Sequence, residues 1–251
     1  MPQQKPRLLA DLTWPQIAEL VAAGEELCVL PVGATEQHGP HLPVSTDTDI
    51  AEAVCREASR RTGAPLLPTL WATSSQAHTT AWPGTFSLPP RLLVDVVVEV
   101  ACWVWASGFR KLLVVNGHVG NASPLRVAAD EIRARGELRV GVLSWYDLTP
   151  EIAAEVTSDA DEWHAHAAET SLMLHLRPDL VDMSLARDDP DRTRELVLSY
   201  TVAETSTEGV TGAPTRASAE QGAGLFETVV DALVDRIERA RSESPPALGK
   251  T

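Results

Sequence analysis

The chain has 251 residues, which is enough to bury a sizeable core in one large α/β domain or in two small ones. Its 21 basic and 35 acidic residues give a net charge of −14, which argues against a nucleic acid or an anionic membrane as a partner. Hydrophobic residues make up 44% of the chain, and no apolar run approaches the roughly 18 residues that span a bilayer, so we expect a soluble globular protein.

The first half of the sequence predicts alternating helices and strands. Thr13 begins a capping-box pattern with proline in the first turn, which predicts a helix ending at Gly24. The continuous apolar run at 27–32 is typical of a strand buried on both faces. The other expected elements of this half are a helix at 48–62, a strand at 66–71, a polar loop at 73–84 and a long helix at 90–108.

The second half continues this alternation. We expect strands at 111–115 and 138–146 around a helix at 124–135, an ambiguous acidic segment at 149–161 and a helix at 162–176. A polar connector at 187–194, a loop or short hairpin at 200–216, an amphipathic helix through 226–237 and a disordered tail from about Ser242 complete the chain. Strands alternating with helices predict one α/β domain over residues 1–251, with a mainly parallel sheet covered by helices on both faces.

The cysteines and the N-terminus indicate the compartment. Cys28, Cys55 and Cys102 are odd in number and lie far apart in apolar contexts, so we interpret them as reduced core residues. The N-terminus lacks the apolar core of a signal peptide. We therefore expect a cytoplasmic protein.

Two of the predicted strands end in residues that bind metal ions. The strand at 27–32 is followed by Gly33-Ala-Thr-Glu36-Gln-His38, and the strand at 111–115 is followed by Asn116-Gly-His118. Ligands of parallel sheets bind beyond the carboxyl ends of the strands, which favours a site here. Glu36 and His38 face the same way on an extended stretch and can flank one or two ions. Solvated polar turns are the alternative interpretation of both motifs.

Two further segments add carboxylates and imidazoles. Asp47 can bridge two metal ions ~3.5–4 Å apart, although it can equally serve as a helix N-cap. On the helix expected at 162–176, His166 and Glu169 share a face and His164 lies at the start; a merely solvated cluster is the alternative. Such a set, with no thiolate, suits a catalytic Zn or Mn site that holds a water.

In this order along the chain, the motifs resemble those of the creatininase (creatinine amidohydrolase) family, from about residue 12 to residue 240. The resemblance implies a three-layer α/β/α fold, usually assembled into hexamers. It also implies two divalent ions, Zn and/or Mn with Fe as a further candidate, at a centre that hydrolyses C–N amide bonds. The matching residues are Gly33-Ala-Thr-Glu-Gln-His-Gly-Pro-His-Leu-Pro43, Thr46-Asp-Thr-Asp49, Pro83-Gly-Thr85, Asn116-Gly-His-Val-Gly-Asn121, His164-Ala165, Glu169-Thr-Ser171 and Gly209-Val-Thr-Gly212.

The resemblance also assigns roles to residues. One metal ion would be held by Glu36, Asp47 and His118. The other would be held by His38, Asp47 and a further carboxylate, so that Asp47 bridges the two. His164 matches the catalytic histidine that shuttles a proton to the leaving nitrogen.

The sequence departs from creatinine-cleaving members at the substrate side. Those members carry a glutamate where this chain has Gly120, and we expect Glu169 to supply the missing carboxylate instead. Trp145 and Tyr146 stand in swapped order relative to the lid pattern of those members, and the second lid tryptophan has no clear match. We assign substrate binding to His78 in the polar loop, to Trp163, which is out of register with a lid tryptophan, and to His166, which replaces a usual glycine.

The resemblance leads to one main hypothesis and two alternatives. The main hypothesis is an amidohydrolase that uses a metal-bound hydroxide to cleave a non-peptide or cyclic amide of the creatinine type. The first alternative keeps the site but acts as a mycofactocin precursor peptidase or a formamide hydrolase, which the absence of the lid tryptophans favours. The second is a family member that binds metal or ligand without turnover. We expect a small-molecule amide or short peptide as substrate, and a homohexamer.

Overall fold

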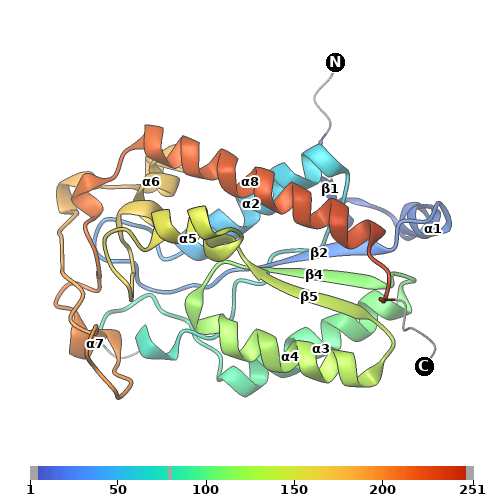
Figure 1. The fold of residues 1–251 in the computed structure, drawn as a ribbon, viewed down its shortest axis with the longest axis horizontal. Helices are drawn as coiled ribbons and strands as arrows, with labels where there is room; N and C mark the ends of the chain where they lie inside the picture. The colour runs from blue at the N-terminus through green and yellow to red at the C-terminus, as the bar shows by residue number, and fades with distance from the viewer. Residues whose placement is uncertain (1–4, 79–80, 247–251) are drawn as a thin grey trace.

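A five-stranded parallel sheet forms the centre of the protein (Figure 1). This computed structural model describes residues 5–78 and 81–246. The strands lie in the order β1-β3-β2-β4-β5. Their bounds are Arg7–Leu8 for β1, Leu27–Val32 for β2, Pro65–Leu66 for β3, Lys111–Asn116 for β4 and Arg139–Ser144 for β5.

The carboxyl ends of the three long strands coincide. Val32 of β2 lies opposite Asn116 of β4, which in turn lies opposite Ser144 of β5. All six residues of β2 are buried, as its unbroken apolar sequence predicts for a strand covered on both faces. After β2 the chain crosses to β3, and after β3 it returns to β4 on the other side of β2. The β2–β4 boundary is therefore the switch point where α/β sheets bind ligands.

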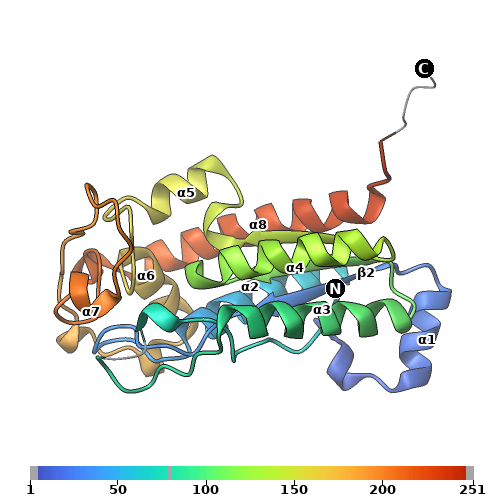
Figure 2. The same cartoon turned by 90° about the horizontal axis from the view of Figure 1, so that it is seen from below.

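Helices cover both faces of the sheet, which confirms the three-layer α/β/α prediction (Figure 2). One layer contains α2 (Thr46–Thr62), α5 (Pro150–Val156), α6 (Ala167–Leu176) and α8 (Ala219–Ser242). The other contains α3 (Pro90–Ala106) and α4 (Ala122–Arg135), with α1 (Trp14–Ala22) near its edge. The short helix α7 (Val202–Thr205) lies beyond the carboxyl ends of the strands (Figure 1). Each layer has its own buried apolar cluster against the sheet.

Helix α8 lies very close to α6 where the two cross. At Gly222 of α8, an added Cβ atom would overlap the Ser171 carbonyl group and lie 2.9 Å from the Leu172 nitrogen. Only a residue without a side chain allows this approach. The contact fixes the position of α6, the helix that carries Glu169.

Several predicted elements begin or end elsewhere in the structure. The strand expected at 66–71 is the two-residue β3, because Pro68 has no N–H to donate to a ladder; Leu70 forms an isolated bridge with Val32. The strand expected at 138–146 ends at Ser144, and Trp145–Asp147 forms a 3-10 turn. The sequence analysis missed β1, which has only two residues, and found no clear type for the segment that contains α5.

The helix predicted at 162–176 begins only at Ala167, so that prediction is wrong for its first five residues. His164 instead pairs with Thr211 in an antiparallel bridge. Ala165 then has a positive φ of 50°, in the left-handed region that residues with a Cβ atom rarely adopt. His166 is the N-cap residue, with extended backbone. The two histidines are therefore not on one helical face.

The two ends of the chain add little to the fold. Helix α8 continues through Ser242, so the tail that we predicted to be disordered begins later than expected, and its residues 247–251 lie outside the described part. Among residues 5–78 and 81–246, no helix is both long and apolar enough to span a lipid bilayer.

Candidate metal centre and active site

Four segments bring the five predicted metal ligands together at the carboxyl ends of β2 and β4. Two ligands follow β2, one lies in the first turn of α2, one follows β4 and one lies on α6. All five are at most 6% exposed. They are Glu36, His38, Asp47, His118 and Glu169.

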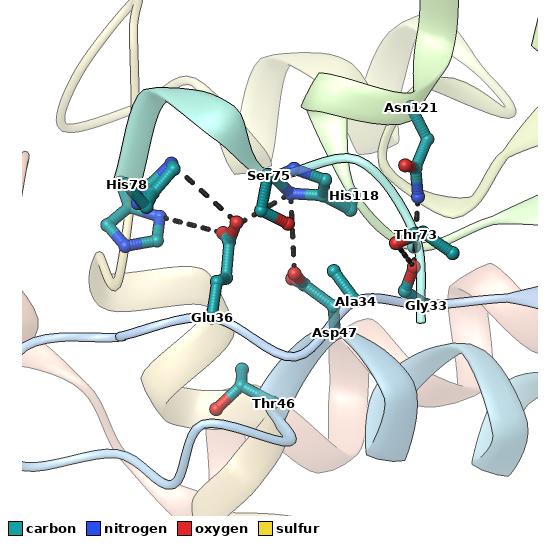
Figure 3. Close-up of polar contacts among 12 residues, drawn as sticks. Gly33, Ala34, Glu36, Thr46, Asp47, Thr73, Ser75, His78, His118 and Asn121 are labelled. Carbon is teal, nitrogen blue, oxygen red and sulfur yellow. Dashed lines mark hydrogen bonds and ion pairs between the residues drawn. The ribbon is translucent and has the colours of Figure 1, made fainter. Parts of the chain in front are cut away.

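Glu36, Asp47 and His118 form one compact group. His118 Nδ1 lies 3.2 Å from Glu36 Oε1 and 3.3 Å from Asp47 Oδ2. Figure 3 shows Glu36 reaching toward the His118 ring from the strand-end loop, with Asp47 approaching from the helix. One donor atom from each residue lies within 4.8 Å of the others, so a single ion can contact all three.

A second candidate group contains His38, His164 and Glu169. His38 Nε2 lies 3.3 Å from Asp47 Oδ1 and 3.4 Å from Glu169 Oε1. The two oxygens of Asp47 thus face different histidines: Oδ2 faces His118 and Oδ1 faces His38. Asp47, a member of the first group, therefore also contacts His38 of the second.

Buried atoms without hydrogen bonds mark the centre as a metal site. Both carboxylate oxygens of Glu36, Asp47 Oδ2 and His38 Nε2 make no hydrogen bond, although all are buried. Buried polar atoms normally have partners, because leaving one unpaired costs about 1–3 kcal/mol. Divalent cations would satisfy these carboxylates and imidazoles, which are ligand types of Zn and Mn. The residues present therefore fit a divalent metal ion such as Zn or Mn.

The electrostatics of the five residues agree with a site that binds cations. Burial raises the pKa of Glu36 well above its usual range, and the charge of Asp47 raises it further. Burial alone would lower the pKa of His38, but Asp47 and Glu169 together raise it well above the usual value. The metal-free cluster thus retains protons, and cations that replace those protons would relieve the repulsion between the carboxylates.

Hydrogen bonds hold the loops that carry the ligands. The Gly33 carbonyl accepts a hydrogen bond from Thr73 Oγ1 at 2.7 Å and another from Asn121 Nδ2 at 2.9 Å (Figure 3). One carbonyl therefore joins the segments after β2, after β3 and after β4. The position of Asp47 in the first turn of α2 also places its negative charge at the positive end of the helix dipole.

His164, the predicted catalytic histidine, lies beside this centre. Its Nε2 lies 2.8 Å from the backbone carbonyl oxygen of Gln37, which can only accept, and 3.1 Å from the Gln37 side-chain nitrogen, which can only donate. The shorter contact favours a hydrogen on Nε2 and a lone pair on Nδ1, which lies 3.7 Å from Glu36 Oε1. Burial, with the nearby His78 and His38, lowers the pKa of His164 well below its usual value. The ring is therefore a neutral base.

The three residues assigned to substrate binding lie in different places. His78 lines the cavity, with Nε2 at 3.7 Å from Glu36 Oε2, and together with Glu36 and His164 it forms a further group that could hold an ion. Trp163 also lines the cavity and packs edge-on against Tyr146 at 5.3 Å. His166 does not line it: the ring is fully buried behind Glu169. This position argues against direct substrate contact by His166.

A cavity of about 590 Å³ opens over the centre. Its floor includes Glu36, Asp47, His118 and Glu169. One side of it comes from the segment 193–205, of which the sequence predicted only the two ends, as parts of a polar connector and of a loop. That segment contributes apolar side chains that are largely exposed at the rim, Leu196, Val197, Leu198 and Tyr200.

Sequence reasoning also missed Gln37. Its side-chain Nε2 lies 3.1 Å from His78 Nδ1 and 3.1 Å from His164 Nε2. Its backbone carbonyl oxygen lies 2.8 Å from the same His164 nitrogen. The only signal in the sequence was its position between Glu36 and His38. An amide side chain there was easily passed over beside two stronger metal ligands.

Comparisons with known proteins agree with this geometry. A family model described as creatinine amidohydrolase matches residues 10–237. The chain belongs to the creatininase family. It is 33% identical over 256 residues to the creatinine amidohydrolase of Pseudomonas putida, covering 95% of this chain and 97% of that protein. It is 35% identical over 228 residues to the mycofactocin precursor peptide peptidase of Mycobacterium tuberculosis (strain H37Rv), covering 84% of each.

Solved creatininases share the fold closely. A crystal structure of creatinine amidohydrolase superimposes with a TM-score of 0.82 at 32% identity, covering 96% of this chain and 100% of that one. A manganese form of creatininase has a TM-score of 0.81, with the same identity and coverage. The chain is therefore a creatininase-family amidohydrolase, a hydrolase acting on C–N bonds, with a candidate metal-binding cluster of histidines and carboxylates.

Proposed function

We propose that this creatininase-family enzyme hydrolyses the C–N bond of a neutral or cationic amide at a centre of two divalent ions, Zn and/or Mn. The observation that carries the proposal is the position of Asp47. Its two oxygens lie 3.3 Å from two different histidines, each of which has its own second carboxylate. A solvated turn, one alternative for these residues, would need exposed side chains, whereas Asp47 is 2% exposed. The other alternative, a helix N-cap at Asp47, does not apply because the N-cap residue is Ser45.

The residues divide into two ligand sets. When bound, the two ions would polarise the substrate carbonyl and allow a water to act as nucleophile at neutral pH. Glu169 takes the place of the carboxylate that Gly120 cannot provide. One set is Glu36, Asp47 and His118, and the other is His38, Asp47 and Glu169.

His164 performs the proton transfer. Because Nε2 donates to the Gln37 carbonyl, Nδ1 faces the centre as a free base. Nδ1 accepts a proton from the attacking water and then donates it to the nitrogen that leaves. A single group that first accepts and then donates the proton satisfies general acid–base catalysis in both halves of the reaction.

The charges around the cavity define the substrate class. None of the described residues that line the cavity is a lysine or an arginine, whereas Glu162 and the carboxylates of the centre line it. Away from the proposed metal ions, a substrate carboxylate or phosphate would therefore meet no cationic side chain, and burying an unpaired anion is costly. A neutral cyclic amide of the creatinine type meets this condition.

A short-peptide substrate is the second candidate, and the cavity volume favours it. About 590 Å³ lies within the range of sites that take drug-sized ligands, and the apolar residues of the 196–200 rim can contact the rest of such a substrate. The candidate is a peptidase of the mycofactocin-precursor type whose substrate presents no carboxylate near the cleaved bond. A formamide substrate, the other form of this alternative, would occupy less of the cavity than a short peptide. Binding without turnover is the remaining alternative, and turnover of any substrate in the panel below would exclude it.

The test combines metal analysis with a substrate panel. The protein is loaded with Zn or Mn, dialysed and analysed for metal, and then incubated with creatinine, an N-formyl amine and a short peptide. We expect about two ions per chain and turnover of one substrate. Asp47→Asn should lose metal and activity. The control Asp49→Asn, two residues further along the same helix, should keep both. A wild-type protein that retains no divalent ion would refute the proposal.

Assembly and location stay predictions. Large apolar side chains are exposed on α1 and α3, with Trp14 at 80% and Trp103 at 71% exposure, and a subunit interface would cover such residues. We propose the homohexamer that the family resemblance implies, in the cytoplasm. Light scattering coupled to size-exclusion chromatography tests the assembly, and a monomer would contradict it.

A further inference from the structure

We propose that His166 is a positioning residue that orients Glu169 toward the second metal ion. The inference rests on the proposed two-metal function and extends it to a residue outside the two ligand sets. It also replaces the substrate-binding role that we first assigned to His166. The ring is fully buried and touches Glu169 from the side away from the cavity.

Both nitrogens of His166 are engaged. Nε2 lies 2.9 Å from the Val156 carbonyl oxygen, and Nδ1 lies 3.2 Å from Glu169 Oε2. The other oxygen of Glu169, Oε1, lies 3.4 Å from His38 Nε2. Both partners are acceptors, so a ring with hydrogens on both nitrogens holds Glu169 Oε2 and leaves Oε1 facing the proposed ion.

The surroundings prevent the ring from turning away. Trp163 lies against one face, with ring centroids 4.6 Å apart. The backbone on either side is fixed as well, because Asp159 Oδ2 accepts hydrogen bonds from the Ala167 nitrogen at 3.1 Å and from the Ala213 nitrogen at 2.7 Å. His166 is the N-cap residue of α6 and Glu169 lies in the first turn, so the two side chains meet at the i, i+3 spacing.

Gly120 explains why Glu169 needs such support. A Cβ atom at this position would overlap the His118 ring and lie 2.9 Å from the Ser74 carbonyl oxygen, so a carboxylate cannot enter from there without movement of the His118 ring. Among the described residues, Glu169 is the one further carboxylate that joins His38 in a candidate metal group. Any rotation of Glu169 would leave His38 with Asp47 as its one carboxylate partner and with His164 as the other member of its group.

A buried group behind a metal ligand is expected to raise affinity, because it fixes the orientation of that ligand. Loss of such partners typically costs 10–100-fold in metal affinity. The effect should be confined to the ion held by His38 and Glu169. The group formed by Glu36, Asp47 and His118 has no contact with His166.

The test measures Zn²⁺ binding to the metal-free protein by calorimetry with a competing chelator. We expect two sites in the wild type and, in His166→Ala, a weakening of one site by roughly 10–100-fold with the other unchanged. His166→Asn, whose amide N–H can occupy the position of Nδ1, should recover much of the affinity. His175→Ala, an exposed histidine on the same helix, is the matched control and should change neither site.

The outcomes separate the inference from the function on which it rests. Equal affinities in wild type and His166→Ala overturn the positioning role. Equal weakening of both sites, together with a lower melting temperature, shows a structural role and also overturns it. If His166→Ala does not fold, His166→Asn decides. Recovery of most of the affinity in this variant supports the positioning role, and loss of one site in a stable Asn variant overturns it. A wild type without any Zn²⁺ site refutes the proposed function itself.

Discussion

The Gly222→Ala substitution should destabilise the protein, although alanine favours helices. In α8 the change should gain about 1 kcal/mol of helix propensity. The new Cβ atom, however, would overlap the Ser171 carbonyl group, far inside the ~3.3–3.6 Å that a carbon and a carbonyl oxygen normally keep. The atom that it meets is backbone, which cannot rotate aside as a flexible side chain can. Helix α8 must therefore move away from α6.

The expected size follows from the cost of overpacking. Forcing an extra carbon into a packed interior typically costs about 1–3 kcal/mol, and this contact lies at the upper end because two backbones meet. After the propensity gain, we expect a net loss of about 2 kcal/mol. For a protein of this length that corresponds to a fall of about 4–8 °C in the melting temperature. Movement of Ser171 should also disturb Glu169, two residues earlier on α6.

The matched control is Gly224→Ala, two residues further along the same helix. A Cβ atom there meets nothing within 4 Å, so only the propensity gain remains. We expect this variant to melt about 2–4 °C above the wild type. Thermal unfolding followed by circular dichroism, with and without Zn²⁺, measures both variants. If Gly222→Ala melts at or above the wild-type temperature, the close packing of α6 and α8 is refuted.

Three further predictions concern the site and the core. Gly120→Ala should push the His118 ring aside and weaken Zn²⁺ binding by roughly tenfold or more, measured by calorimetry. Burial lowers the pKa of His78 to about 3, so the folded state stays neutral there while the unfolded state binds a proton below about pH 6.5. As the pH is lowered from 6.5 to 3, this residue should therefore reduce the free energy of unfolding of the metal-free protein by about 1.4 kcal/mol per pH unit, measured by urea unfolding. Burial raises the pKa of two thiols, so a thiol reagent at pH 8 should label the native protein only at Cys102 and leave Cys28 and Cys55 unmodified until unfolding.

Each of these has a result that would contradict it. For Gly120→Ala it is wild-type affinity, with Gly224→Ala as the control. For the pH dependence the relevant quantity is the difference between wild type and His78→Asn, because other groups titrate as well; identical slopes would show that His78 is not held neutral. For the thiols, labelling of three cysteines in the native state would show that the core is open.

The parallel sheet and the candidate ligands after β2 and β4 could be predicted from the sequence, because local patterns carry them. An unbroken apolar run followed by Gly33 marks the end of a buried strand, and Glu36 and His38 stand directly behind it. The same holds for β4 and His118. The parallel topology then places both strand ends at one edge, which is why the site was predictable without any knowledge of distances.

The surroundings of Glu169 could not be predicted in the same way. The spacing of His166 and Glu169 fits a helix equally well from 162 or from 167. The true start depends on the bridge between His164 and Thr211, whose partners lie far apart in the sequence. The 193–205 side of the cavity was missed for a related reason: its exposed apolar residues have no helical or strand period, and only the fold brings them to the site.

The left-handed backbone at Ala165 places two histidines on opposite sides of one short segment. In an ordinary extended chain, residues two apart point the same way. Here His164 faces the cavity, where it can exchange protons, whereas His166 faces the interior, where it holds Glu169. One strained residue thus joins the proposed acid–base and metal-binding halves of the site. A bulky or β-branched residue at position 165 would disturb both halves at once, although its own side chain would touch neither substrate nor ion.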